Sequence, residues 1–175
     1  MLSKTTMRLA RALLFVTALL FFALVGTGIW LMGYPAQAMT VFAETLSPDD
    51  AISPAAFRAL SFAWLVMLGL GLLLLWHMGA LFRAFAQGDT LAPTVLRHVA
   101  GAGWALIAIV LYRLLLRPIE GLTRALFPAP DAPDRMTISF SSQDVTMLLG
   151  GVLLLMLARV LLEASRAAEE NRAFV

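Results

Sequence analysis

The sequence contains no cysteine among its 175 residues. This absence excludes disulfide bonds, thiolate metal sites, cysteine nucleophiles and haem attached through thioether bonds. Charge is also scarce, because only 14% of the residues are Asp, Glu, Lys or Arg and the formal net charge is +2. The 13 basic residues are spread along the chain and form no basic stripe, so we expect no direct contact with nucleic acid.

Apolar side chains are in large excess. Hydrophobic residues make up 61% of the sequence and the mean hydropathy is +0.86, far above the range of soluble globular proteins. Four apolar stretches are long enough to cross roughly 30 Å of hydrocarbon, and we predict spans at about residues 12–32, 59–82, 98–116 and 145–162. The predicted fold is an all-α integral membrane protein, a single domain over residues 1–175 built as a four-transmembrane-helix bundle with small extracytoplasmic connections.

The first apolar stretch also resembles a secretory signal peptide. Lys4, Arg8 and Arg11 precede it, and Ala36-Gln37-Ala38 resembles a cleavage site. However, the uncharged run that begins at Ala12 is longer than the apolar region of a usual signal peptide. We therefore expect a retained helix.

Several residues mark the expected ends of the spans. Ser53-Pro54 is typical of an N-cap followed by a first-turn proline, and residues 141–144 (Ser-Ser-Gln-Asp) are also N-cap types. Pro118 is predicted to end the third span. Residues 41–46 are predicted to form a short interfacial helix, and residues 136–141 alternate like a strand. A small outer cap formed by the two connections that contain these segments is one arrangement open to the chain, and the sequence does not decide it.

Lys and Arg residues predict the orientation. By the positive-inside rule, the basic residues before the first span place the N-terminus in the cytoplasm, and an even number of crossings returns the C-terminus there. The inner side then holds eight basic residues and the outer side five. They are Lys4, Arg8, Arg11, Arg83, Arg97, Arg159, Arg166 and Arg172 inside, and Arg58, Arg113, Arg117, Arg124 and Arg135 outside.

Two histidines, His77 and His98, are the weak candidates for cofactor binding. Both fall toward the cytoplasmic ends of adjacent spans, where a pair of imidazoles can ligate haem or a metal. An imidazole at headgroup level can equally be hydrated, and no carboxylate–histidine cluster or catalytic triad accompanies the pair. We therefore expect no enzyme activity, no cofactor, no metal and no small-molecule substrate.

Charges near the predicted membrane and small residues within it have structural explanations. Arg113 is close enough to a helix end to reach the headgroups, and Arg159 lies one turn before Glu163, where the two side chains are expected to pair. A transport pathway is the alternative for such charges, but no span carries a charge at its midplane. Glycines are expected at close helix contacts, namely Gly69, Gly71, Gly101, Gly150 and Gly151.

Two segments carry a resemblance to a known family. The turn "QGDTLAPTVLRHVAGAGW" and the terminal "EENRAFV", in a four-span hydrophobic chain, resemble bacterial membrane proteins of domain-of-unknown-function family 2975. Gly88, Asp89 and Arg97 match the family's inner turn, and Leu91 stands where an aromatic residue is usual. Residues at the C-terminus match its Glu-Asn and closing Val, namely Glu170, Asn171 and Val175, and Phe174 adds an apolar side chain beside them.

This resemblance implies a location and a partner, since the family has no established activity. Its members are often encoded beside a small helix-turn-helix protein, which implies a component of the bacterial inner membrane that binds a cytoplasmic regulator. The turn around Gly88 and the tail around Asn171 are the expected partner surface. The alternative is an accessory subunit packed against a larger membrane complex through its glycine-rich faces.

Overall fold

The computed structural model describes residues 4–45, 53–87, 93–128 and 141–173, and these residues form five α-helices and no strand. The helices are α1 (Lys4–Gly33), α2 (Pro35–Thr45), α3 (Pro54–Gln87), α4 (Pro93–Leu126) and α5 (Ser142–Ala173). All but α2 are long and apolar enough to cross a membrane, and each contains one of the four predicted spans. The prediction of an all-α membrane protein with four spanning helices is confirmed.

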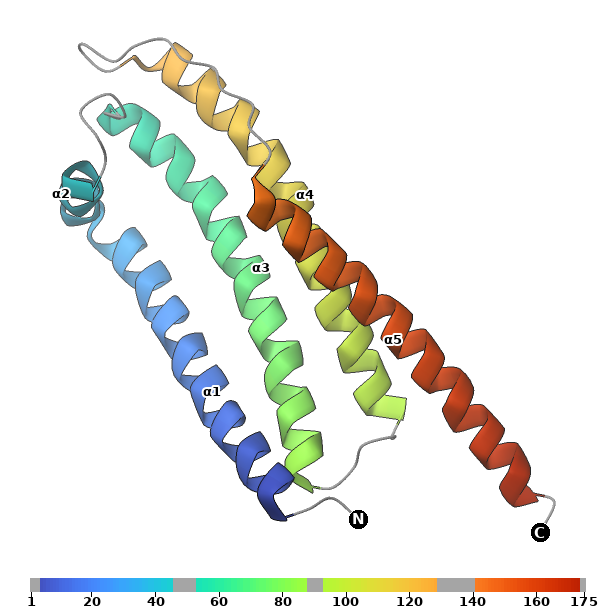
Figure 1. Cartoon of the computed structure of the whole chain (residues 1–175). Coiled ribbons are helices and arrows are strands. Elements are labelled where there is room, and N and C mark those ends of the chain that lie inside the picture. The colour runs from blue at the N-terminus through green and yellow to red at the C-terminus, as the bar shows by residue number, and fades with distance from the viewer. Residues whose placement is uncertain (1–3, 46–52, 88–92, 129–140, 174–175) are drawn as a thin grey trace.

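The four long helices are arranged in a row in the order α1, α3, α4, α5 (Figure 1). Within the described residues, α3 packs against α1 and α4, while α5 packs against α4 alone. The short helix α2 lies across the end of α1 and touches α3. We call the end where α1 and α4 begin and α3 and α5 end the N/C end, and the other end the distal end.

Helices α3 and α4 are longer than the predicted spans. Each has 34 residues, which corresponds to about 51 Å at 1.5 Å per residue, against roughly 30 Å of hydrocarbon. The extra length of α3 at its start agrees with the expected cap. Ser53 Oγ accepts a hydrogen bond from the Ala56 amide at 3.2 Å, and Pro54 opens the helix.

The prediction that Pro118 ends the third span is wrong, because α4 continues through it to Leu126. Proline removes one backbone hydrogen bond, but contacts with α3 hold α4 on both sides of it. Before the proline, the Tyr112 hydroxyl donates to the Ala63 carbonyl at 2.7 Å. After it, Glu120 Oε1 accepts from the Trp64 indole at 3.1 Å, so tertiary contacts compensate for the missing bond.

Two apolar clusters lie at opposite ends of the row. The distal cluster contains Leu31, Ala38 and Phe57, which join α1, α2 and α3. The residues that resemble a signal cleavage site thus lie in α2, where Ala38 is fully buried. The N/C-end cluster joins α3, α4 and α5 and consists of Leu81, Val95, Val99 and Ala158.

Between these clusters α4 and α5 cross at two glycines. A Cβ atom on Gly103 would lie 2.8 Å from the Gly151 carbonyl oxygen, and one on Gly151 would lie 2.9 Å from the Gly103 carbonyl oxygen. The helices can approach this closely only because both positions lack a side chain. The expected role of glycine is therefore confirmed at Gly151, whereas a Cβ atom on Gly69 would meet no atom of another described helix within 4 Å.

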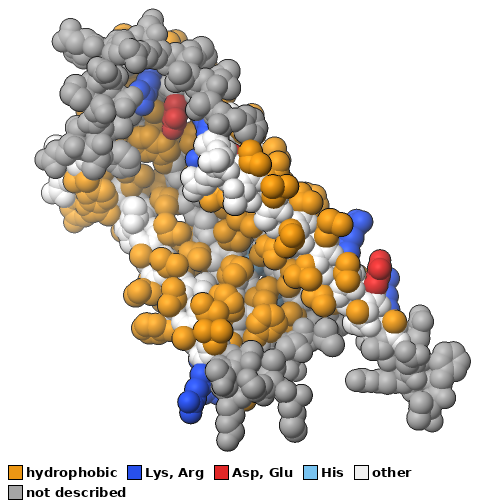
Figure 2. All heavy atoms as spheres, viewed as in Figure 1, with side chains coloured by type: hydrophobic (Ala, Val, Ile, Leu, Met, Phe, Trp, Pro, Cys, Tyr) orange, Lys and Arg blue, Asp and Glu red, His pale blue; other side chains and the backbone are white. Residues whose placement is uncertain are grey.

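The surface is apolar around the middle of the helices, as a membrane-spanning protein requires (Figure 2). Charged side chains of the visible face lie toward the two ends of the molecule.

The strand-like segment at residues 136–140 lies outside the described residues. At the distal end, the Ser53 hydroxyl donates to the Phe127 carbonyl at 2.7 Å and joins the start of α3 to the end of α4.

Candidate functional site

The structure brings His77 and His98 together from α3 and α4. Their Nδ1 atoms are 3.2 Å apart, and the ring centroids are 5.4 Å apart with the ring planes tilted by 54°. At this distance one Nδ1 carries a proton and donates it to the other, so the pair is a hydrogen bond between neighbouring helices. Both side chains are partly buried.

Gly101 makes room for the His77 ring. A Cβ atom at Gly101 would lie 2.4 Å from the His77 Cε1 atom and 2.6 Å from each ring nitrogen. The ring therefore lies directly over the α4 backbone, one turn after His98. Any side chain at position 101 would displace it.

This geometry does not fit haem ligated by both histidines. Axial ligation places the two rings on opposite sides of the porphyrin, with the iron bonded to one nitrogen of each. Here the rings contact each other directly through their Nδ1 atoms, which leaves no space for a macrocycle between them. In the described part of the chain, no group of three His, Asp or Glu side chains is placed to hold a metal ion.

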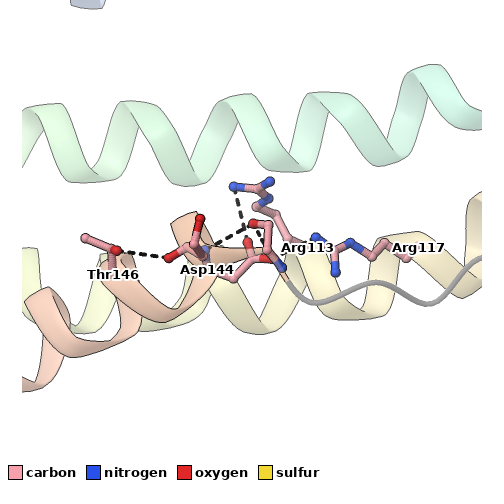
Figure 3. A network of polar contacts seen from close by, with 6 residues as sticks. Arg113, Arg117, Asp144 and Thr146 are labelled. Carbon is pink, nitrogen blue, oxygen red and sulfur yellow. Dashed lines mark hydrogen bonds and ion pairs between the residues drawn. The ribbon is translucent and has the colours of Figure 1, made fainter.

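A second polar site joins α4 to the start of α5 (Figure 3). Asp144 is fully buried, with Oδ2 at 2.7 Å from Arg117 Nη2 and Oδ1 at 3.3 Å from Arg113 Nη1. Asp144 Oδ2 also accepts from the Ser141 amide at 3.2 Å, while Ser141 Oγ accepts from the Asp144 amide at 3.3 Å. These reciprocal bonds form a capping box at the start of α5.

The Asp144 site holds two helices together and provides no evident reactive group. Two guanidinium groups share one carboxylate, so a single positive charge remains unbalanced among Arg113, Arg117 and Asp144. Burial of the carboxylate is compensated by these ion pairs and by the capping bonds. Arg117 Nη1 is buried and has no hydrogen-bond partner within the described residues.

From the sequence, Arg113 is expected near the headgroups and Asp144 among the capping residues, and their pairing is not predicted. A usable signal was present. Arg113 and Arg117 are four residues apart and therefore lie on one face of a helix, on the same predicted side of the membrane as Asp144. What the sequence did not show is that α5 begins at the level of these arginines.

The predicted pairing of Arg159 with Glu163 is wrong. Both side chains are exposed on α5, and the structure records no ion pair between them. An exposed pair gains little from contact and loses side-chain entropy, so the two charges stay separately solvated.

The predicted partner surface is only partly described. Arg97 is exposed in the second turn of α4, and Glu170 and Asn171 lie in the last turn of α5. Both segments are at the N/C end (Figure 1). The other members of the surface lie outside the described residues, namely Gly88, Asp89, Leu91, Phe174 and Val175.

The end of α5 extends beyond its neighbours. Ala158 is the α5 residue of the N/C-end cluster, where it meets Val95 and Val99 near the start of α4. From Ala158 the helix continues for 15 residues to Ala173, about 22 Å, whereas α4 begins only two residues before Val95. None of the α5 side chains described beyond Ala158 is buried.

No family model, curated protein or solved structure that was compared with the chain matches it.

Proposed function

We propose that this chain is a non-enzymatic protein of the bacterial inner membrane that acts through protein contacts at its N/C end. The partner would be a cytoplasmic protein, and the resemblance to the family described above favours a helix-turn-helix regulator. The extension of α5 beyond its neighbouring helices is the observation that carries this proposal.

The extension is the last part of the continuous helix α5, and none of its described side chains is buried. Helices shorter than about 12–15 residues are marginal in water, because most helical stability in proteins comes from packing of one face. Here the described side chains that follow the predicted span, at residues 163–167, are exposed or half-buried. A partner that covers this segment would supply the missing packing.

The distribution of exposed charge supports the proposed orientation. Six arginine side chains described at the N/C end are all exposed: Arg8, Arg11, Arg83, Arg97, Arg159 and Arg166. At the distal end Arg113 and Arg117 are half-buried and neutralised in part by Asp144. Arg58 is also exposed at the distal end, so the described arginines show an excess of exposed positive charge at the N/C end, in the same sense as the count of eight basic residues to five.

The absence of cysteine makes the orientation directly testable. A single cysteine is introduced either at exposed Gln87, at the N/C end, or at exposed Ser142, at the distal end. Intact cells are treated with a membrane-impermeant maleimide. We expect S142C to be labelled and Q87C to be labelled only after lysis. Labelling of Q87C in intact cells would contradict the proposed orientation.

The partner proposal is tested by affinity purification from native membranes in mild detergent. Arg166→Glu changes the charge of the α5 extension, and Arg58→Glu makes the same change at an exposed distal position. We expect a soluble protein to co-purify with the wild type and with Arg58→Glu, and to be lost with Arg166→Glu and on deletion of residues 171–175. Equal recovery with both charge reversals would refute the proposed contact.

An accessory subunit of a larger membrane complex is the second candidate. It is favoured by α5, which packs against α4 alone and exposes apolar side chains such as Leu149, Leu153 and Met156. Lipid covers such a face equally well, so exposed apolar side chains alone do not identify a subunit. The affinity purification described above distinguishes the two candidate functions. A membrane complex that survives both charge reversals and the tail deletion, with no soluble partner, would favour the subunit.

A further inference from the structure

The histidine pair lies beside the apolar cluster that joins three helices at the N/C end. His77 is one turn before Leu81 on α3, and His98 is one residue before Val99 on α4. Through Ala158 the same cluster holds α5 just before its extension begins. A change in the distance between the two histidines is therefore a change in the packing of α3 against α4, the helix that carries α5.

The contact depends on the number of protons that the pair carries. With two neutral rings, or with one neutral and one charged ring, one Nδ1 donates and the other accepts. A second added proton gives two imidazolium rings, in which both Nδ1 atoms are donors and no acceptor remains. Two positive charges would then face each other at the present separation of 3.2 Å.

Among the described side chains of the helices that pack at this end, no carboxylate lies next to the histidines along the chain, and Asp89 falls outside the described residues. Neither α1 nor α3 contains an Asp or Glu, and the one acidic residue of α4 is Glu120, near the distal end. The nearest ionisable residues along the chain are basic, namely Arg83 on α3, Arg97 on α4 and Arg159 on α5, all of them exposed. On α5 the closest carboxylate in sequence to the cluster is Glu163, which is exposed and lies beyond Ala158.

The contact of the His77 ring with the Gly101 backbone limits how the repulsion between the two charged rings is relieved. The His77 ring lies on the backbone of Gly101, so it cannot move toward α4. Relief requires that the His98 ring turn out of the interface or that α3 separate from α4. Separation of the helices disturbs the packing of Leu81 against Val95 and Val99.

We propose that His77 and His98 form a proton-operated joint, in which uptake of a second proton opens the contact between α3 and α4 at the N/C end. One proton is taken from the solution for each opening, and no covalent bond changes. Acidification on the side of the N/C end is the stimulus. Protonation of histidine clusters is known to rearrange protein interfaces in this way. This joint would operate whether or not the α5 extension binds a partner.

Spin labels at exposed Gln87 and Thr94 report the distance between the end of α3 and the start of α4. Because the chain has no cysteine, Q87C and T94C are the only labelled sites. The labelled full-length protein is placed in lipid nanodiscs with a chelator, and double electron–electron resonance is recorded at pH 8 and pH 5. We expect the mean distance to increase by about 2 Å or more at pH 5.

The variant His98→Gln keeps a hydrogen-bonding side chain but limits the pair to one charge. In this background, we expect the same distance at both pH values. Circular dichroism checks that the variant is folded, and His77→Gln serves if it is not. An unchanged distance in the wild type would overturn the proposal, as would an equal increase in the glutamine variant. A change that requires added Zn²⁺ and not acid would also overturn it.

Discussion

Replacement of Gly151 by alanine should separate α4 from α5, because the added methyl group has no space. Its Cβ would lie 2.8 Å from Ile107 Cγ1 and 2.9 Å from the Gly103 carbonyl oxygen. The isoleucine side chain is able to rotate, but a helical carbonyl oxygen is fixed by the backbone. The helices must therefore shift to accommodate the new atom.

The required shift follows from the contact distances. Ordinary van der Waals contact for a Cβ begins near 3.4 Å, so α4 and α5 must separate by about 0.5 Å at the crossing. Overpacking of this kind costs about 1–3 kcal/mol. In a helix interior, alanine is otherwise favoured over glycine by about 0.5–1 kcal/mol. The net effect expected for Gly151→Ala is a loss of up to roughly 2.5 kcal/mol of unfolding free energy.

The matched control is Gly69→Ala on α3, because nothing lies within 4 Å of a Cβ at that position. Unfolding in mixed micelles is followed by tryptophan fluorescence during titration with sodium dodecyl sulfate. We expect the midpoint to fall for Gly151→Ala and to stay or rise for Gly69→Ala. Equal midpoints for the two variants would refute the close crossing of α4 and α5.

Two further substitutions test the polar contacts at the distal end by the same titration. Asp144→Asn removes the charge that two arginines share, so we expect a clearly lower midpoint, whereas Glu163→Gln, at an exposed and unpaired carboxylate, should leave it unchanged. A wild-type midpoint for Asp144→Asn would show that the ion pairs contribute nothing. Ser53→Ala removes an N-cap bond and the link to Phe127, and we expect a loss of about 0.5–2 kcal/mol. A change below the error of the titration would contradict the capping role of Ser53.

The wrong prediction that the helix ends at Pro118 and the incomplete prediction for His77 and His98 have the same physical origin. Both depend on contacts between helices. Proline predicts a break from local backbone chemistry, but bonds from α3 on either side of it carry α4 onward. Likewise, the sequence placed His77 and His98 toward the same membrane face and did not specify whether their rings meet. The two rings meet because the His77 ring lies on the backbone of Gly101. This position depends on which faces of α3 and α4 are turned toward each other.

The number, approximate position and apolar character of the spanning helices were determined by the sequence alone. A stretch of about 20 apolar residues has few stable alternatives to a membrane-spanning helix, because every backbone polar group must be satisfied within lipid. The order of the helices, the pairing of Asp144 with two arginines and the contact of the histidines were decided by tertiary structure. These features depend on the rotation and relative height of each helix, which apolar composition does not encode.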